Sequence, residues 1–296
     1  NSKNELANAI AGLERPDSTL KPDDFILVKA NWEPKSHNLI GMAAELSLGA
    51  DAFVFVDDNP VERDIVRQHV PGVAIPELDK PEHYIYAIDR AGYFEVTAMT
   101  ADDANRNEQY KANAERSRLQ TNFTDYQDYL LSLEMAAEIQ PFTPMYLTRI
   151  AQLTNKSNQF NLTTKRYTQS EIEAAAADPN CITLYGKLED KFGDNGVVTV
   201  CIGHIEGSIL HLDLWLMSCR VLKRDMEYAL LDELVRVASQ RGITRLYGYY
   251  YPTAKNAMVK DFYPRMGFET IGEGIYSLTI TNYDRRCNTI HVNRTT

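Results

Sequence analysis

Two adjacent carboxylates, Asp57 and Asp58, are the residues of this sequence whose types and spacing most directly suggest chemistry. They follow the apolar run 53–56 and precede Asn59 and Pro60, and proline is favoured at the first position of a helix. The pattern predicts a buried strand of a parallel sheet, an acidic loop and a helix. Because neighbouring carboxylates repel each other, we expect Mg2+ beside them. The alternative is that one carboxylate caps the helix and the other is only solvated.

A hydroxyl and an ammonium group belong to the same predicted set. Ser2 and Lys35 follow, or can follow, strands of the sheet that ends at Asp57. Ligands of an open α/β sheet bind beyond the carboxyl ends of the strands, so these side chains can converge at one edge. There the hydroxyl and ammonium would hold phosphoryl oxygens while the carboxylates hold the metal. Taken singly, Ser2 can be only a helix cap and Lys35 only a surface lysine.

The composition restricts the partners and the location. The 296 residues are 44% hydrophobic and 24% charged, as in a globular protein long enough for two domains. The net charge of −10 argues against nucleic acid and anionic membranes as partners. No apolar run approaches the ~18 residues of a membrane span and no leader resembles a signal peptide, so we expect a cytoplasmic location. The cysteines form no CxxC pair, which predicts neither a zinc site nor disulfides.

The periodicity of the apolar residues predicts two α/β domains, at 1–92 and 134–296, joined by a helical connector at 93–133. In the first domain we expect helices at 3–14, 35–46 and 60–69, and strands at 25–28, 53–56 and 73–75. In the second we expect helices at 143–153, 170–177, 225–241 and 256–266, and strands at 183–188, 197–203, 209–214, 245–251 and 276–281.

Several strings of the sequence resemble motifs of one known family. In the first domain they are NSKN at 1–4, NWEPK at 31–35 and FVFVDDNPVER at 53–63. These resemble the second, third and fourth motifs of haloacid-dehalogenase-type (HAD) phosphotransferases, specifically the subfamily III-C domain of the FkbH-like family. The resemblance continues through QLTNKSNQFNLTTKRYT at 152–168, DKFGDNGVV at 190–198 and WLMSCRVLKRDME at 215–227. It implies an α/β fold in which a partial Rossmann-like HAD domain is followed by a GNAT-like acyltransferase domain.

The resemblance also implies an activity and a set of site residues. FkbH-like enzymes dephosphorylate a phosphorylated three-carbon glyceryl unit and transfer the acyl group to the phosphopantetheine thiol of an acyl carrier protein, as in polyketide biosynthesis. Lys35, Asp57 and Asp58 would then be catalytic, with both aspartates holding Mg2+. Tyr263 would protonate the departing thiolate of CoA or phosphopantetheine. The residues expected to bind substrate or phosphate are Ser2, Lys3, Asn59, Asn158, Gln159, Asn161, Arg220, Arg224 and Asn256.

Two departures from the family pattern concern the first domain. The family's first motif, DxDx[TV], carries the aspartate nucleophile, and this string does not occur in the sequence. In this fold the motif precedes Ser2, so we expect it upstream of Asn1 and expect this chain alone to lack phosphotransfer activity. Relatives commonly carry a cysteine where Asn1 stands. An amide cannot carry a glyceryl group as a thioester, which argues against loading on the enzyme itself.

The second domain departs from the GNAT pattern in its phosphate loop, which normally reads [RQ]xxGx[GA]. The matching stretch 222–227 has neither glycine, and Asp225 and Glu227 place negative charge where a pyrophosphate would bind. Arg220 and Arg224 could still hold the single phosphate of a phosphopantetheine arm. A charged helix start is the alternative interpretation of this stretch. Tyr263 could equally be a core aromatic, and the alternating polar residues at 159–163 could either bind a pantetheine chain or only face water.

Three functions therefore remain open from the sequence. The first is the acyl-unit loader that acts with a carrier protein. The second is a GNAT-type N- or O-acyltransferase in sugar or amino-sugar modification, and the missing glycines count against it. The third is a non-catalytic docking module for a carrier protein. The set formed by Lys35, Asp57 and Asp58 favours the first.

Overall fold

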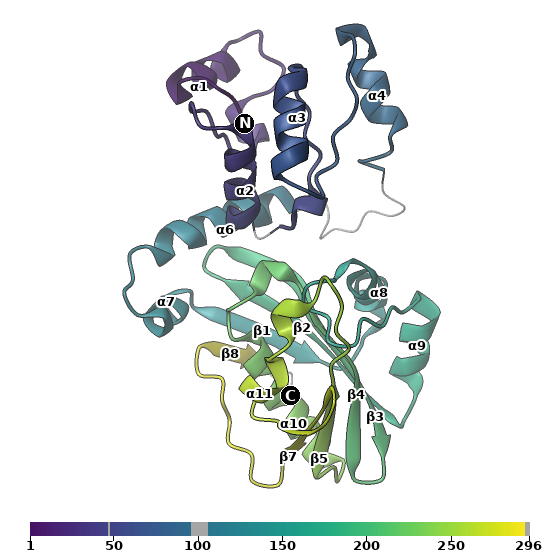
Figure 1. Cartoon of the computed structure of the whole chain (residues 1–296). Helices are drawn as coiled ribbons and strands as arrows, with labels where there is room; N and C mark the ends of the chain where they lie inside the picture. The colour runs from purple at the N-terminus through teal and green to yellow at the C-terminus, as the bar shows by residue number, and fades with distance from the viewer. Residues whose placement is uncertain (47, 96–105, 294–296) are drawn as a thin grey trace. The chain divides into compact units, whose positions relative to one another are not determined.

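The computed structural model describes residues 1–46, 48–95 and 106–293, and Figure 1 shows its helices and strands. The chain divides into two compact units, Asn1–Ser117 (unit 1) and Arg118–Thr296 (unit 2). The division falls inside the connector expected at 93–133, of which residues 96–105 lie outside the described part. Within the described residues, no helix is both long enough and apolar enough to cross a membrane.

Unit 1 is mainly helical, with short segments of extended chain between the helices. Its helices are α1 (Leu6–Glu14), α2 (Lys35–Glu45), α3 (Pro60–His69), α4 (Tyr84–Arg90) and α6 (Arg106–Gln120), which crosses the boundary between the units. Short 3-10 turns lie at Pro22–Asp24, Ala50–Ala52 and Pro81–His83. The core contains Leu39, Phe55, Val66 and Val70, contributed by α2, by the segment before the acidic loop and by the α3 region.

The helix after the acidic loop has the predicted bounds because the sequence specifies its start. The Asn59 side chain accepts a hydrogen bond from the Val61 amide at 2.9 Å, and Pro60 occupies the first helical position. The predicted helix at 3–14, by contrast, begins only at Leu6. Ser2, before the helix, has an extended backbone that pairs with the segment around Ala30.

The strands expected in unit 1 are reduced to isolated parallel bridges, Ser2–Ala30 and Val54–Ala74. The parallel direction agrees with the predicted α/β pattern. The strand expected at 25–28 is wrong: pairing begins only at Ala30, and Phe25 is 36% exposed rather than buried in a core. At 53–56 only Val54 forms a bridge, and Val56 is 43% exposed.

Unit 2 contains a mixed eight-stranded sheet in the order β6-β7-β5-β4-β3-β2-β1-β8. The pairs β1–β8 and β4–β5 are parallel and the others are antiparallel. The strands are β1 (Met135–Gln140), β2 (Cys181–Asp190), β3 (Gly193–Glu206), β4 (Ile209–Met217), β5 (Arg245–Tyr249), β6 (Glu269–Gly272), β7 (Ile275–Thr279) and β8 (Ile290–Asn293). A sheet covered by helices confirms the predicted α/β class.

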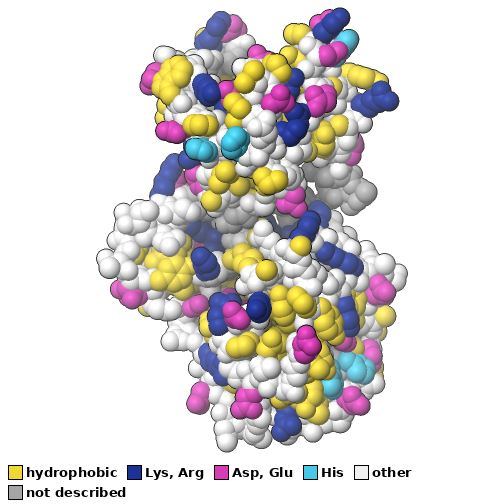
Figure 2. Space-filling model, viewed as in Figure 1, with side chains coloured by type: hydrophobic (Ala, Val, Ile, Leu, Met, Phe, Trp, Pro, Cys, Tyr) yellow, Lys and Arg dark blue, Asp and Glu magenta, His cyan; other side chains and the backbone are white. Residues whose placement is uncertain are grey.

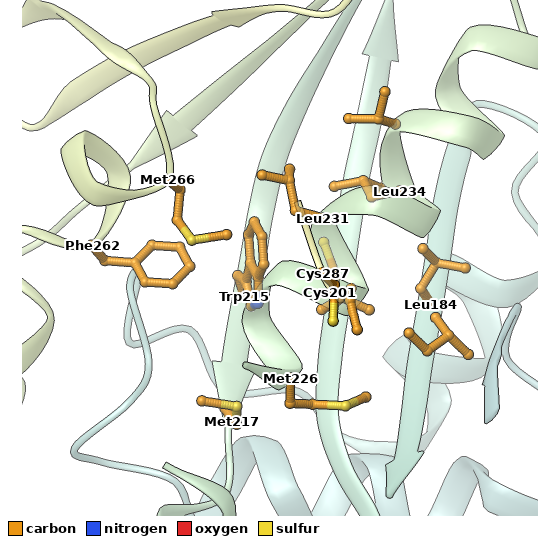
Figure 3. Packing of buried hydrophobic residues seen from close by; sticks show 14 of the residues in the cluster. Leu184, Cys201, Trp215, Met217, Met226, Leu231, Leu234, Phe262, Met266 and Cys287 are labelled. Carbon is orange, nitrogen blue, oxygen red and sulfur yellow. The ribbon is translucent and has the colours of Figure 1, made fainter. Parts of the chain in front are cut away.

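Helices cover both faces of this sheet. They are α7 (Tyr126–Ser132), α8 (Leu147–Lys156), α9 (Gln169–Ala177), α10 (Met226–Gln240) and α11 (Phe262–Arg265), with 3-10 turns at Pro144–Tyr146, Cys219–Val221 and Ala257–Val259. Alternation along β4 divides its side chains: Leu214 and Leu216 pack with α8 and α9, whereas Trp215 packs with α10 and α11. Figure 3 shows Trp215 between Phe262 and the α10 leucines.

The sequence located the central strands of unit 2 better than its outer ones. The predicted strands at 183–188, 197–203 and 209–214 lie within β2, β3 and β4. Strands β1, β6 and β8 were not predicted, because they are short and β1 and β8 pair across the whole length of the domain. The alternating segment 159–163 forms a single bridge, Asn161–Leu216, instead of a strand.

Candidate functional site

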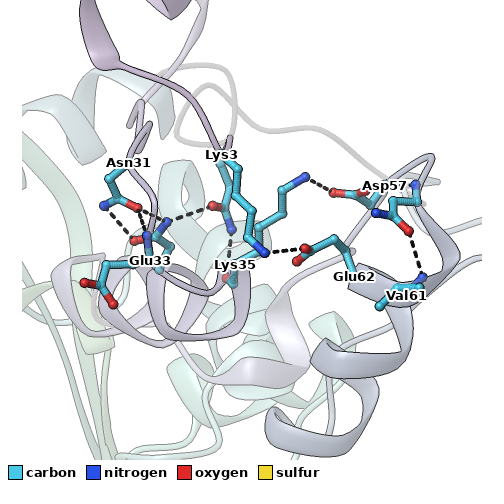
Figure 4. Close-up of polar contacts among 10 residues, drawn as sticks. Lys3, Asn31, Glu33, Lys35, Asp57, Val61 and Glu62 are labelled. Atoms are coloured by element: carbon cyan, nitrogen blue, oxygen red, sulfur yellow. Dashed lines mark hydrogen bonds and ion pairs between the residues drawn. The ribbon is translucent and has the colours of Figure 1, made fainter.

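The predicted lysine and acidic loop of unit 1 meet in the structure. Lys35, the first residue of α2, places its Nζ 2.5 Å from Asp57 Oδ2. Both side chains are largely buried, at 15% and 6% exposure. Figure 4 shows this contact joining the start of α2 to the acidic loop. Because both side chains are shielded from water, this charge-assisted hydrogen bond holds the two groups in position.

The acidic loop is held in shape by the helix that follows it. The second oxygen of Asp57 accepts the Asn59 amide at 3.0 Å. The buried guanidinium of Arg63 donates to the carbonyls of Asp57 at 2.7 Å and Asp58 at 3.1 Å. These bonds leave the Asp58 side chain exposed beside the buried Asp57. Asn59 serves as the helix cap, and its expected phosphate-binding role would have to coexist with that bond.

The N-terminal segment reaches the same region. The backbone of Ser2 pairs with Lys29 and Asn31, and the Asn1 side chain donates to the Lys35 carbonyl at 2.9 Å. Lys3, predicted to bind phosphate, instead places its Nζ 2.5 Å from Glu62 Oε1 (Figure 4). The other oxygen of Glu62 is buried and finds no hydrogen-bond partner among the described residues.

The donor set at this loop fits a hard cation with a phosphate. Mg2+ in proteins is usually held by one or two carboxylates, with water and phosphate completing its six ligands. Asp57 and Asp58 supply two such carboxylates, and each oxygen of Asp57 keeps a lone pair besides the bonds to Lys35 and Asn59. Asp58 is exposed to solvent and Lys35 is 15% exposed. A phosphoryl group could therefore approach the Lys35–Asp57 pair from the solvent.

The loop between β4 and α10 in unit 2 has the backbone of a glycine loop without its glycines. Lys223 and Asp225 both adopt positive φ, at 63° and 59°, in the left-handed region that glycine favours. Arg224 lies between them with its side chain 8% exposed, 3.3 Å from the fully buried carboxylate of Asp190. The Arg224 guanidinium thus compensates a buried charge, and its expected phosphate-binding role stays a prediction.

The first turn of α10 disfavours further negative charge. Burial raises the pKa of Glu227 above its ordinary value, and the neighbouring Asp225 raises it further. Burial also raises the pKa of Asp225, although a hydrogen bond from the Thr289 hydroxyl at 2.9 Å lowers it in part. A pyrophosphate would meet two carboxylates here, as the sequence predicted. Arg220 is half-buried and its Nε donates to Ser218 at 3.2 Å.

The segment 159–163, expected to offer polar groups to a ligand, makes backbone contacts within the fold. β4 and β5 stay paired only as far as Leu212 and Gly248, and the segment lies beside β4 beyond that point. Its Leu162 amide donates to the Trp215 carbonyl at 3.1 Å, and its Leu162 carbonyl accepts the Tyr251 amide at 2.9 Å. Both backbone polar groups of Leu162 are thus used by the chain's own backbone and are not free to pair with a pantetheine chain.

The asparagines predicted to bind substrate are used within the fold. Asn256 is fully buried, and its Nδ2 donates to the carbonyls of Asn161 and Tyr251 at 3.0 Å each. Its Oδ1 accepts the amide and the hydroxyl of Thr253 at 2.7 and 3.1 Å. The side chain of Asn161 is also buried and accepts the Thr164 amide at 2.8 Å. Four bonds saturate the Asn256 amide and burial hides that of Asn161, which favours a structural role for both; their expected ligand contacts stay predictions.

The remaining two amides of this region are more accessible. Asn158 is half-buried and accepts a hydrogen bond from Arg166. Gln159 is likewise half-buried. Their predicted contacts with a ligand stay predictions.

Tyr263 lies in the core beneath β5. It is 1% exposed, and a Cβ on Gly248 would fall 2.2 Å from its ring, so only glycine fits at that position. Its hydroxyl finds no hydrogen-bond partner among the described residues, and burial raises its pKa well above the ordinary value. This environment fits a packed aromatic. The role as general acid that the family implies stays a prediction. It would need a path by which the proton of the Tyr263 hydroxyl reaches the leaving thiolate.

One polar arrangement in unit 2 was not identified from the sequence. His211 on β4 lies 2.6 Å from the Tyr249 hydroxyl through Nδ1 and 3.4 Å from Glu206 through Nε2. A tyrosine, a histidine and a carboxylate in this order resemble the nucleophile, base and orienting group of a relay. Side chains alternate between the two faces of a strand, which places His211 and Tyr249 on one face of the sheet. The register between β4 and β5 cannot be predicted from the sequence.

Charges of both signs are mixed at the surface. Figure 2 shows Lys and Arg side chains interspersed with Asp and Glu on the visible face of each unit. Such a distribution gives a weaker local field than a patch of one sign.

Comparison with known proteins gives two partial likenesses. No family model matches the sequence, and no curated protein matches it either. One third of the chain, 33%, is 41% identical to the N-terminal part of a Bacteroides fragilis protein that contains a phosphatase domain and was crystallised with Mg, at a TM-score of 0.32. The match covers 26% of that chain, so the sequence spans about a quarter of its length.

The second likeness is to acetyltransferases and covers about half of the chain. The ribosomal-protein-S18-alanine N-acetyltransferase of Escherichia coli is 14% identical over 51% of this chain and 99% of its own, at a TM-score of 0.39. A Thermoplasma acidophilum N-acetyltransferase in complex with coenzyme A is 17% identical over 49% of this chain and 99% of its own, at a TM-score of 0.36.

Proposed function

We propose that this chain is part of a HAD-type phosphotransferase of the FkbH-like kind. It would dephosphorylate a phosphorylated three-carbon acyl unit and deliver the glyceryl group to the phosphopantetheine thiol of an acyl carrier protein. The observation that carries the proposal is the 2.5 Å contact between Lys35 and the buried Asp57, next to the exposed Asp58. An ammonium group and two carboxylates so placed suit a phosphoryl group bound with Mg2+.

Each residue of this site has a stated part in the proposal. Lys35 and Ser2 would hold the phosphoryl oxygens, and Asp57 and Asp58 would hold Mg2+. When bound, the metal supplies positive charge to the phosphoryl oxygens. The aspartate nucleophile of the family's first motif is expected in residues that precede Asn1, so the proposal concerns the protein that includes them.

The second unit would receive the carrier arm rather than a complete CoA. A phosphopantetheine arm carries a single phosphate, which Arg220 and the exposed Lys223 on the β4–α10 loop could bind. CoA would add a pyrophosphate next to Asp225 and Glu227, whose pKa values are already raised by burial. These carboxylates favour the carrier protein over CoA as the partner of this loop.

The proposal is tested by intact-protein mass spectrometry of a phosphopantetheinylated carrier protein. The carrier is incubated with Mg2+, a bisphosphoglycerate and the natural full-length protein, with this chain in a parallel sample. We expect a glyceryl-sized mass gain with the full-length protein only. The gain should be lost in Lys35→Met and kept in Lys29→Met, since Lys29 forms a half-exposed pair with Glu45 instead.

Two results would contradict the proposal. Equal loading by Lys35→Met and the wild type would remove the Lys35–Asp57 pair from the reaction. No mass gain with the full-length protein, under conditions where the carrier is fully phosphopantetheinylated, would reject the glyceryl loader function.

A further inference from the structure

Three potential metal ligands of different chemistry gather at the end of β2. Asp178 follows the last residue of α9, Cys181 begins β2, and His204 lies directly opposite Cys181 on β3. One ligand atom from each residue lies within 4.8 Å of the other two. Within the described residues, this is the one group of three His, Cys, Asp or Glu side chains that meets this condition.

The separations agree with a small tetrahedral ion. Cys181 Sγ lies 3.6 Å from Asp178 Oδ2 and 3.9 Å from His204 Nδ1. Zinc binds sulfur at ~2.3 Å and nitrogen or oxygen at ~2.0–2.2 Å, so tetrahedral angles put neighbouring ligand atoms about 3.6 Å apart. The two separations from the Cys181 sulfur therefore lie within a few tenths of an ångström of this value, and the Asp178 and His204 ligand atoms lie within 4.8 Å of each other.

The local charges both favour and oppose a cation. Asp178 supplies a negative charge, and a cation would displace the thiol proton of Cys181. Arg241 opposes it, because its guanidinium donates to the Cys181 carbonyl at 2.8 Å and to the Pro179 carbonyl. The arginine bonds to backbone oxygens and not to the three ligand atoms, so it does not occupy their places. A cation that forms strong bonds to sulfur and nitrogen can overcome this repulsion.

We propose that Asp178, Cys181 and His204 form a binding site for a borderline divalent transition-metal ion, with Zn2+ the best match. A thiolate, an imidazole and a carboxylate suit zinc, whereas Mg2+ prefers oxygen ligands alone. The exposed His204 leaves the fourth position open to solvent. Three protein ligands with an open position are the arrangement of zinc sites that bind a water or substrate, whereas closed four-ligand sites are structural.

Other polar groups lie on the same face of the sheet as His204. His204 is directly opposite His211 on β4, and His211 is opposite Tyr247 on β5. Directly paired residues of neighbouring strands project to the same face. A molecule bound at the metal would therefore lie next to the His211–Tyr249 pair, whose atoms are 2.6 Å apart. This places the site on an accessible, polar part of unit 2.

No sequence pattern indicates this site. Asp178 and Cys181 are three residues apart, but His204 is brought to them only by the antiparallel pairing of β2 and β3. The cysteines lack the CxxC spacing by which zinc sites are usually recognised.

The proposal is tested by titrating Co2+ into the purified, metal-free chain and recording absorption spectra. Cobalt replaces zinc in such sites, and a cysteine ligand gives a thiolate-to-cobalt band in the near ultraviolet. We expect this band to saturate at one Co2+ per chain, to disappear on addition of Zn2+ and to persist with excess Mg2+. Cys181→Ser should abolish the band. Asp178→Asn and His204→Gln should each weaken binding at least ~10-fold, by analogy with the loss seen when metal-site support is removed.

Two comparisons make the result decisive. Cys219→Ser, a matched change of another partly exposed cysteine, should leave the spectrum unchanged. Zn2+ should also raise the unfolding temperature of the wild type and of Cys219→Ser, but not that of Cys181→Ser. No near-ultraviolet band in the wild type would overturn the proposal, as would a band that survives in Cys181→Ser or disappears in Cys219→Ser.

Discussion

Replacing Asn256 distinguishes a structural amide from a ligand-binding one. The Asn256→Ala variant loses all four side-chain hydrogen bonds, to Asn161, Tyr251 and Thr253. The bond to the Asn161 carbonyl is buried, so its loss leaves an unsatisfied acceptor that costs about 1–3 kcal/mol. The other three are partly buried and contribute about 0.5–1.5 kcal/mol each. We therefore expect the free energy of unfolding to fall by about 5 kcal/mol.

The isosteric variant Asn256→Asp adds a pH dependence. It keeps the two bonds from Thr253 but turns a carboxylate toward the carbonyls of Asn161 and Tyr251. Burial beside acceptors raises the pKa of the carboxyl in the folded state above its unfolded value of about 4. The folded state then binds more protons than the unfolded state above that pH. The variant should therefore lose stability, relative to the wild type, as the pH rises from 4 to 7.

The assay can isolate the unit that contains Asn256. Trp215 is fully buried in unit 2, whereas Trp32 of unit 1 is 68% exposed. In a Trp32→Phe background, urea unfolding followed by fluorescence reports on unit 2 through Trp215. Asn158→Ala is the control, and we expect it to cost less than about 1 kcal/mol because its side chain is only half-buried. A loss below about 1 kcal/mol for Asn256→Ala would refute the structural assignment and return this amide to the ligand site.

Three further changes in unit 2 test the description of its core. Arg224→Met should lower the free energy of unfolding by about 3–5 kcal/mol because it removes the guanidinium that compensates the buried Asp190 carboxylate. Combining Arg224→Met with Asp190→Leu should recover part of the loss in urea unfolding. Tyr263→Phe should not lower stability, since its hydroxyl finds no partner among the described residues; a thiol-transfer rate about 100-fold lower would identify it as the acid, and an unchanged rate as a packing residue. The raised pKa of Glu227 means that its ionisation above about pH 4.5 opposes folding. In thermal unfolding, the stability of Glu227→Gln relative to the wild type should therefore increase from about pH 4 to pH 7. A difference that does not change with pH would contradict the burial of this carboxylate.

Local patterns predicted the helices and central strands because their causes lie close together in the sequence. Asn59 and Pro60 specify the start of α3 within three residues. The alternation of 209–214 placed β4, which extends to Met217. At the site, the order of Lys35 and Asp57 at predicted strand ends was enough to expect them at one edge, and they are in contact.

Features that depend on pairing between distant segments were not predictable in the same way. The polar alternation of 159–163 is typical of a surface strand, and only the position of this segment beside β4 shows that its amides are already used. The sequence around Arg224 suggests a phosphate ligand, and only the structure shows its contact with Asp190, 34 residues away. The strand predicted at 25–28 failed for a related reason, since an apolar run becomes a strand only where a partner is available.

The most direct test of the account is Mg2+-dependent phosphate release by the natural full-length protein carrying Asp57→Asn. The change keeps the shape of the loop but removes the charge that Lys35 contacts and that Mg2+ requires. Asp64→Asn is the matched control, because Asp64 forms an exposed pair with Arg67 on α3. We predict that Asp57→Asn abolishes phosphate release from a bisphosphoglycerate while Asp64→Asn retains it. Undiminished release by a correctly folded Asp57→Asn protein would contradict the proposed site.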